Sequence, residues 1–308
     1  MKSTLAAGAD ALPLTRSRLA AYLELTRPRI AALVVFTTAV GFLLAGPGAP
    51  DLARLLHTVV GTALAAGGAS ALNQVLERRS DARMARTRDR PLPSGRLTPL
   101  EGLLFGIGLA AAGLAYMALV VHQPLAVLAT AFAVAGYVLL YTPLKRKTSL
   151  NTLVGALAGA TPPLIGWTAA TNALDGPALV LFAILFLWQV PHFLAIAWLY
   201  RDDYARAGFH MLPVRDPGGA RTAWRMVGYS LALIPASLAP SALGWAGAVY
   251  LLGAGILGVG FLTCAVGFLR TRSAAQARRV LRASLLYLPA LLAVRLVDAA
   301  LQSWAGPR

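Results

Sequence analysis

Nine long apolar runs constrain the fold of this chain more than any other feature of the sequence. They lie near residues 30–46, 55–76, 99–121, 124–142, 150–171, 177–199, 222–241, 245–269 and 281–301. A helix needs about 20 mostly apolar residues to cross a bilayer, and each run comes close to that length. Hydrophobic residues make up 57% of the 308 residues and charged residues only 13%, about half the share found in soluble proteins. The sequence therefore predicts an all-α integral membrane protein with nine spanning helices.

Basic residues occupy alternate connections between these runs. All but Arg54, Arg295 and Arg308 of the 28 lysines and arginines lie before Ile30 or within 78–96, 145–147, 201–225 and 270–282. Because basic loops stay in the cytoplasm, the pattern predicts a multi-pass membrane protein with its N-terminus inside and its C-terminus outside. The net charge of +16 is then explained by topology and by contact with anionic membrane lipid, so we expect no nucleic-acid partner.

The sequence favours one membrane domain. Residues 1–25 contain no uninterrupted apolar segment of the kind found in signal peptides, and we expect a flexible cytoplasmic tail there. Residues 26–303 are then a single transmembrane domain. The lone cysteine, Cys264, excludes an intrachain disulfide or a zinc cluster, and no P-loop, HExxH or CxxC motif is present.

Small residues and prolines within the runs predict how the helices pack. Glycine and alanine are frequent over 61–71 and 155–160, which lets neighbouring helices approach closely. Pro162, Pro163 and Pro191 fall inside runs, where proline removes a backbone hydrogen bond and breaks or kinks a helix.

The connection after the second run carries a row of oxygen-bearing side chains. Asn73, Glu77 and Asp81 follow one another at intervals of four, which places them on one face of a helix. Arg86 and Arg90 come next at the same spacing. Mg²⁺ prefers one or two carboxylates together with phosphate oxygens, and arginine binds phosphate bidentately, so the pattern suits a metal-bound diphosphate. A solvated helix end with i, i+4 ion pairs explains the spacing equally well.

Two further polar segments face the same predicted side of the membrane. Asp202 and Asp203 begin the connection after the sixth run and could supply a second carboxylate group, although pairing with neighbouring arginines is the alternative. Lys145 and Arg146 follow the fourth run and could contact phosphate, but positive-inside topology also explains them.

His192 is an ionisable residue within a spanning run, where such residues are costly and tend to be functional. The alternative is a buried histidine that only packs against its neighbours.

The chain resembles the UbiA-type intramembrane prenyltransferases, and among them the branch that acts on heme. The resemblance extends from about Leu25 to the last apolar run. It is carried by Thr26-Arg27-Pro28, by Ala71-Leu-Asn73-Gln, by the segment from Met84 to Leu92 with Gly95-Arg96, by Tyr141 to Arg146, by Trp188 to Phe193, and by Asp203 to Val214. The Arg-Thr-x-x-Arg-Pro-Leu and Pro-His-Phe blocks are its most specific parts.

This resemblance implies a fold, a reaction and a set of site residues. The implied fold is a nine-helix UbiA-type bundle with an active-site cavity open to the cytoplasm. The implied reaction joins the farnesyl group of farnesyl diphosphate to a vinyl group of heme B (protoheme IX), adds water, and yields heme O and diphosphate. The implied cofactor is Mg²⁺, and the implied partner proteins are a heme A synthase or factors of oxidase assembly.

The resemblance also distributes roles among the residues found above. The catalytic residues are Asn73, Glu77, Asp81 and Asp203, and these four together with Asp202 are the candidate metal ligands. Arg86, Arg90, Lys145 and Arg146 would contact the diphosphate. His192 would contact the heme, as an axial ligand or through a propionate, with Tyr204 as a second heme-binding residue.

Departures from the family pattern narrow the interpretation. The common bacterial form has aspartate where this chain has Glu77 and a second acid where it has Arg79. Quinone prenyltransferases of the superfamily carry aspartates where this chain has Tyr200 and Tyr204, which fits the heme branch better. The alternatives are a related transferase for an aromatic quinone precursor or chlorophyll-like acceptor, and a non-catalytic heme transporter.

Overall fold

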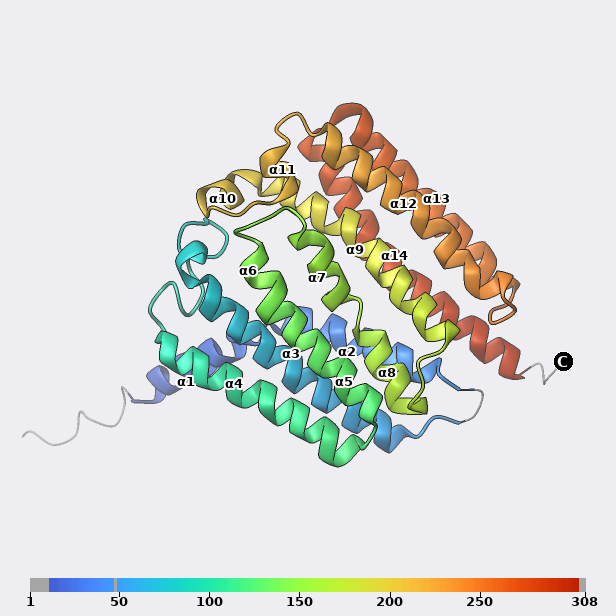
Figure 1. Cartoon of the computed structure of the whole chain (residues 1–308), viewed down its shortest axis with the longest axis horizontal. Coiled ribbons are helices and arrows are strands. Elements are labelled where there is room, and N and C mark those ends of the chain that lie inside the picture. Colours follow the sequence, from blue (N-terminus) through green and yellow to red (C-terminus); the bar gives the residue numbers. More distant parts are fainter. Residues whose placement is uncertain (1–10, 47–48, 305–308) are drawn as a thin grey trace, which may run out of the picture.

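The computed structural model describes residues 11–46 and 49–304, and within these ranges it contains helices and no strand. Figure 1 shows the helices lying side by side in one bundle. In chain order they are α1 (Ala11–Leu25), α2 (Pro28–Leu43), α3 (Leu52–Asp81), α4 (Pro99–Tyr116), η1 (Met117–Val121), α5 (Pro124–Ala135), η2 (Gly136–Tyr141), α6 (Thr142–Leu144), α7 (Asn151–Gly159), α8 (Pro162–Thr171), α9 (Gly176–Leu199), α10 (Arg201–Arg206), α11 (Leu212–Arg215), α12 (Ala220–Ala242), α13 (Ala248–Thr271) and α14 (Ala274–Trp304). η1 and η2 are π-helical turns that continue α4 and α5.

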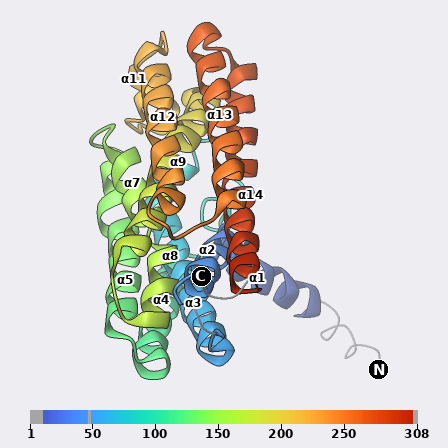
Figure 2. The ribbon, with the colours of Figure 1, turned by 90° about the vertical axis from the view of Figure 1, so that its right-hand side faces the viewer.

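The chain bends sharply between α1 and α2. Residues 18–25 and 28–43 meet at 45°, and α1 projects away from the bundle in Figure 2. Pro28 begins α2, and Arg27 before it adopts a left-handed conformation with φ of 50°. The flexible tail expected over residues 1–25 is therefore wrong from Ala11 onward, where the chain is helical; residues 1–10 lie outside the described part. The apolar residues Ala21 and Leu25 explain the difference, because they are fully buried against Ala71, Leu92 and Leu97.

Seven described helical segments are long and apolar enough to cross a membrane, and the bent pair of α1 and α2 brings the number to eight. The nine runs expected from the sequence include 222–241, which forms most of α12. This helix is not among the seven segments, and it contains Pro235 and Pro240. The structure thus supports a multi-pass membrane protein with seven or eight apolar spans.

Small residues bring helices together as expected. A Cβ added to Gly68 of α3 would lie 2.3 Å from the backbone nitrogen of Ala110 in α4, so only glycine permits this contact.

The prolines within the apolar runs differ in their effect on the helix. The helix is interrupted between Gly159 and Pro162, whereas α9 runs without interruption through Pro191. The expected break therefore occurs at Pro162 and not at Pro191.

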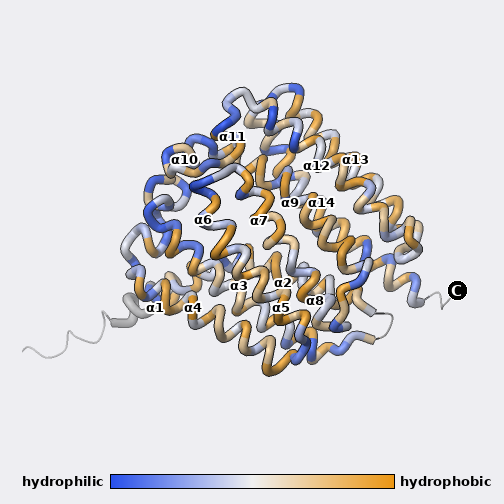
Figure 3. Tube along the Cα trace, viewed as in Figure 1, coloured by the Kyte–Doolittle hydropathy of each residue, from blue (hydrophilic) through white to orange (hydrophobic). Residues whose placement is uncertain are grey.

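Hydrophilic residues gather at the ends of the bundle, as Figure 3 shows, and they are dense around α6, α10 and α11. The largest apolar core joins α2, α7, α8, α9, α12, α13 and α14. A smaller apolar cluster lies at the polar end, where Met84 packs with Ala197, Phe209 and Met211. This contact joins the long loop after α3 to the segment after α9, so the two patterned loops of the sequence lie against each other.

Candidate active site

The last turns of α3 carry three buried polar side chains. Asn73 and Asp81 are fully buried, and Glu77 is 4% exposed. Their four-residue spacing puts them on one face of a single helix, as the sequence predicts. Buried carboxylates need compensating partners, and each of these side chains has a basic one.

Asp81 pairs with Arg90 across the loop that follows α3. Arg90 Nη1 donates to both carboxylate oxygens of Asp81, at 3.0 and 2.9 Å. The Thr87 hydroxyl donates to the Asp81 carbonyl at 2.9 Å and so closes the loop onto the end of the helix. Burial and the positive charge of Arg27 both lower the pKa of Arg90. Two guanidinium groups therefore lie close enough to repel each other, and an anion bound between them would relieve that repulsion.

Glu77 pairs with Lys145, which follows α6. Lys145 Nζ lies 2.7 Å from Glu77 Oε1, with side chains 11% and 5% exposed. The ammonium also lies 4.3 Å from the centre of the Tyr141 ring. Burial by itself lowers the pKa of Lys145, but the charge of Glu77 and the neighbouring tyrosine oxygens outweigh burial and raise it above its ordinary value. Lys145 is thus held as a cation beside the carboxylate row.

Asn73 connects three segments. Its Oδ1 accepts from Arg27 Nη2 at 3.0 Å, and its Nδ2 donates to Thr142 Oγ1 at 2.8 Å. Arg27 Nη1 donates in turn to the Tyr137 hydroxyl at 3.2 Å. The amide of Asn73 therefore positions its neighbours, and its oxygen keeps one lone pair for a metal.

Arg27 is a site residue that sequence reasoning missed. Its guanidinium reaches Asn73, and its Nε is buried without a hydrogen-bond partner in the described part of the chain. The sequence offered one signal, the Thr26-Arg27-Pro28 block. The left-handed backbone that aims the side chain inward is not readable from that block, because such a conformation is rare for arginine.

The segment after α9 reaches the same site through Lys145 and Phe209. The backbone N–H of His210 donates to the carbonyl of Lys145 at 2.7 Å. The Phe209 ring centre lies 5.7 Å from Lys145 Nζ and 6.0 Å from the ring centre of Tyr204. Tyr204 therefore packs beside Phe209, which contacts Lys145.

The two aspartates of α10 are arranged differently from each other. Asp203 forms an ion pair with Arg206, and its side chain is 13% exposed. Asp202 is 86% exposed and lies 3.8 Å from Arg201 Nε. Among the described residues, no three of histidine, cysteine, aspartate and glutamate come close enough to form a metal site. The structure therefore does not assemble Glu77 and Asp81 into one such group with either aspartate of α10.

Arg86 and Arg146 form their described contacts with residues other than Asn73, Glu77 and Asp81. The Arg86 guanidinium carbon lies 5.1 Å from the centre of the Tyr200 ring. Arg146 Nη2 donates to Ser80 Oγ at 3.0 Å. In this structure Arg146 ties the segment after α6 to α3, and Arg86 joins the two patterned loops.

His192 belongs to α9, and its side chain contacts α14. Its Nδ1 is 2.7 Å from Ser284 Oγ, and its ring stacks on Trp188 with centres 5.0 Å apart. Trp188 Nε1 donates to the Ser284 carbonyl at 2.8 Å. The hydrogen bond fixes the ring through Nδ1. No described residue hydrogen-bonds Nε2, the nitrogen that a ligand would use.

The donor set at the end of α3 fits a hard cation. Carboxylate and amide oxygens are the ligands that Mg²⁺ prefers, and α3 supplies two carboxylates. Glu77 Oε1 is buried with the Lys145 ammonium 2.7 Å away as its charged partner. A carboxylate oxygen keeps a lone pair beside one such contact, so the residues present are compatible with Mg²⁺.

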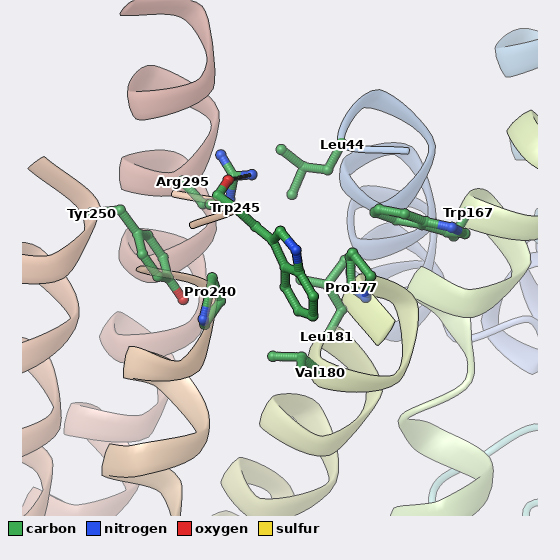
Figure 4. Close-up of a pocket in the computed structure, with 9 residues that line it drawn as sticks. All are labelled: Leu44, Trp167, Pro177, Val180, Leu181, Pro240, Trp245, Tyr250 and Arg295. Atoms are coloured by element: carbon green, nitrogen blue, oxygen red, sulfur yellow. Dashed lines mark hydrogen bonds between the residues drawn. The ribbon is translucent and has the colours of Figure 1, made fainter. Parts of the chain in front are cut away.

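Two hollows in the bundle lie away from this cluster. One, shown in Figure 4, has a volume of about 30 Å³ and lies among Trp167, Pro177, Trp245, Tyr250 and Arg295. It holds one or two water molecules at most and lies where α9 begins, at the opposite end of that helix from α10. The other, of about 360 Å³, is lined by Arg201 and Arg272. Neither is the cavity around Asn73, Glu77 and Asp81 that the resemblance implies.

The chain is similar to known proteins over nearly its whole length. Residues 34–288 match the model of the UbiA prenyltransferase family. The chain is 49% identical to a protoheme IX farnesyltransferase of Solibacter usitatus, with 90% of this chain and 98% of the relative covered. It is 46% identical to the protein of that name from Salinibacter ruber, with the same coverages.

Solved structures share the fold. A digeranylgeranylglyceryl phosphate synthase superimposes with a TM-score of 0.77 at 19% identity, covering 92% of this chain and 98% of the other. A UbiA homologue from Archaeoglobus fulgidus, bound to DMAPP and Mg²⁺, gives 0.68 at 18% identity, covering 90% and 99%. The family model and the two bacterial relatives together show that this chain belongs to the UbiA prenyltransferase family, in the group of the protoheme IX farnesyltransferases.

Proposed function

We propose that this protein farnesylates protoheme IX. It joins C1 of farnesyl diphosphate to a vinyl group of heme B as the bond to diphosphate breaks, and water then adds to the other vinyl carbon with loss of a proton. The products are heme O and diphosphate. The observation that carries the proposal is the 49% identity to a protoheme IX farnesyltransferase over 90% of the chain.

The basic residues around α3 bind the leaving group. Lys145, Arg90 and Arg27 are cations that contact the polar face of α3. Diphosphate develops negative charge as its bond to C1 breaks, and fixed cations in a buried site stabilise that charge strongly. Arg86 and Arg146 lie further out, and on this proposal they exchange their present partners for phosphate oxygens.

Glu77, Asp81 and Asn73 are the proposed ligands of Mg²⁺ on this face, with Asp203 and Asp202 approaching from α10 when substrate is bound. The A. fulgidus homologue, which shares the fold, binds Mg²⁺ with DMAPP. When bound, the ion neutralises diphosphate oxygens and so makes diphosphate a better leaving group. The carboxylates hold that charge in place, and Arg90 and Lys145 keep them oriented.

The heme is proposed to lie against α9. His192, whose ring is fixed by Ser284 and Trp188, contacts the iron or a propionate, and Tyr204 contacts the porphyrin nearer the diphosphate. Apolar side chains around the vinyl group and the farnesyl chain exclude water until the new bond has formed. Orientation of C1 against the vinyl carbon contributes as much as charge.

The proposed topology has nine spans, with α12 added to the eight segments described above, and a cavity open to the cytoplasm. The N-terminus is cytoplasmic and the C-terminus outside. The basic connections support this orientation. Residues 26–303 form the proposed single transmembrane domain, in the bacterial inner membrane, and a heme A synthase or oxidase assembly factor is the proposed protein partner.

Mass spectrometry of extracted heme tests the function directly. Cells that lack their own heme O synthase and express this protein are expected to accumulate a heme heavier than heme B by one farnesyl group and one hydroxyl group. Cells with the empty vector are the control. Heme B alone in both, with a prenylated aromatic acceptor in the expressing cells, would instead favour a quinone-precursor transferase.

A further inference from the structure

A basic hollow lies at the junction of α9, α10, α12, α13 and α14, away from the buried polar face of α3. It has a volume of about 360 Å³. Its lining includes Trp198, Arg201, Asp202, Gly218, Arg272 and Ala274. At ~30 Å³ for each water in the liquid, this space is large enough for a phosphate group with its glycerol. Asp202, a proposed Mg²⁺ ligand, lies on its rim, and none of the residues proposed to bind diphosphate lines it.

One wall of the hollow is rigid. Trp198 is 7% exposed and packs edge-on against Phe268, with ring centres 5.2 Å apart. The backbone of Gly219, with φ of 73°, lies so close to this indole that an added Cβ would be 2.5 Å from a ring carbon of Trp198. The same Cβ position is 3.5 Å from the side chain of Arg272. The indole, the start of α12 and Arg272 are therefore packed together.

Positive charge dominates the lining. The Arg201 guanidinium carbon lies 4.7 Å from the centre of the Trp198 ring. Its acidic neighbour, Asp202, is 86% exposed and 3.8 Å away, so the carboxylate is largely solvated. Arg272 donates to the Gly218 carbonyl at 3.3 Å and forms no ion pair with any described acid. Two guanidinium groups thus line one hollow with a single, well-hydrated carboxylate, and arginine is the side chain best suited to phosphate.

The position of the hollow identifies the source of the phosphate. Arg272 directly follows α13, a helix that qualifies as a membrane span and whose Ile256 is 74% exposed. α14 begins at Ala274 and exposes Leu285 and Leu286 further along. Exposed apolar side chains on spanning helices face lipid chains, so the hollow lies at the depth of the headgroups. Basic pockets between spanning helices bind anionic headgroups.

We propose that this hollow binds the phosphate of an anionic phospholipid through Arg201 and Arg272. Neither arginine is among the residues proposed to bind diphosphate. An Arg201→Gln/Arg272→Gln variant is therefore expected to lose bound lipid. The matched control is Arg278→Gln/Arg279→Gln, which removes the same charge from exposed arginines of α14 that do not line the hollow.

Native mass spectrometry of the purified full-length protein in detergent tests the proposal. With phosphatidylglycerol added, wild type and the control are expected to retain one lipid more tightly than phosphatidylcholine, and the Arg201→Gln/Arg272→Gln variant at least fivefold less. Arg201→Lys/Arg272→Lys, which keeps the charge, is expected to restore part of the binding. If the double glutamine variant does not fold, Arg201→Gln alone is used, with an expected loss of at least twofold.

Equal lipid retention by all variants, or equal loss in the control, would overturn the proposal. A parallel titration with inorganic phosphate distinguishes the sources. Inorganic phosphate at the same concentration is expected to leave the bound lipid in place. Displacement of the lipid at that concentration would assign the hollow to a free anion and contradict the lipid assignment.

Discussion

Glu77 and Lys145 form a buried ion pair, 2.7 Å apart, between the end of α3 and the segment after α6. Removing one partner of a buried pair leaves the other charge unpaired, which costs about 3–5 kcal/mol. Lys145→Gln is therefore expected to lower the free energy of unfolding by about that amount. Glu77→Gln/Lys145→Gln is expected to recover more than half of the loss, although neither variant turns over. The measurement is a double-mutant cycle of unfolding in mild detergent, and strictly additive effects would contradict a direct pair.

The same pair predicts how activity depends on pH. Glu77 holds the pKa of Lys145 above its ordinary value despite burial. A raised pKa means that the stabilisation is fully present below about pH 10.4, the unperturbed value, and is lost only as the pH rises through the higher folded value. We therefore expect no loss of activity or stability from this lysine between pH 7 and 10. A decline of wild-type activity near pH 8 that disappears in Lys145→Arg would contradict the pairing.

Arg27 is expected to contribute to turnover although it lies far from Asn73, Glu77 and Asp81 in sequence. A hydrogen bond from a charged donor is worth about 1.5–3 kcal/mol, so Arg27→Gln should lower kcat/KM for farnesyl diphosphate by about 10- to 100-fold. Arg29→Gln is the matched control, since Arg29 is exposed two residues away. Steady-state kinetics with heme B held constant provides the measurement. Equal effects of both substitutions would indicate that only local charge matters.

The proposed role of Asp81 in binding Mg²⁺ predicts that it matters more for turnover than Asp89 in the loop that follows α3. Chelation is expected to stop turnover, and added Mg²⁺ to restore it. Asp81→Asn should lower kcat by at least about 100-fold, a typical effect of losing transition-state charge stabilisation. Asp89→Asn, whose carboxylate is 90% exposed in the same loop, should remain active. Turnover by Asp81→Asn at the wild-type rate would remove Asp81 from the metal site.

His192 is expected to affect heme and not farnesyl diphosphate. His192→Ala should weaken heme binding at least tenfold and change the heme absorbance spectrum, with little change in the affinity for farnesyl diphosphate. Ser284→Ala, which removes only the partner of Nδ1, should have a smaller effect of the same kind. An unchanged heme spectrum with normal turnover in His192→Ala would rule out the contact.

The sequence predicted those parts of the site that depend on local periodicity. The spacing of Asn73, Glu77 and Asp81 determines a shared helix face once α3 is helical, and the structure confirms that face. The pairing of Arg90 with Asp81 and of Lys145 with Glu77 depends on how loops fold back, and no spacing rule predicts it. Arg146 illustrates the limit, because its neighbour Lys145 contacts Glu77 while Arg146 contacts Ser80.

The spanning helices could be predicted from the sequence because long apolar runs identify them. The apolar runs locate nearly all spanning helices, but the runs do not reveal that α1 is helical, since its apolar residues are buried by distant parts of the chain. The helix is interrupted before the pair Pro162 and Pro163, which occupies the first turn of α8, whereas the single Pro191 is tolerated within the long α9.

Farnesyl transfer by the purified protein tests the central claim most directly. Wild type, Asp81→Ala and Asp89→Ala are each given heme B, Mg²⁺ and labelled farnesyl diphosphate. The labelled heme is then separated, and its mass is determined by mass spectrometry. The account predicts labelled heme O with wild type and Asp89→Ala, and none above background with Asp81→Ala. Equal labelling of heme by all three proteins, or labelling of no heme by wild type, would contradict it.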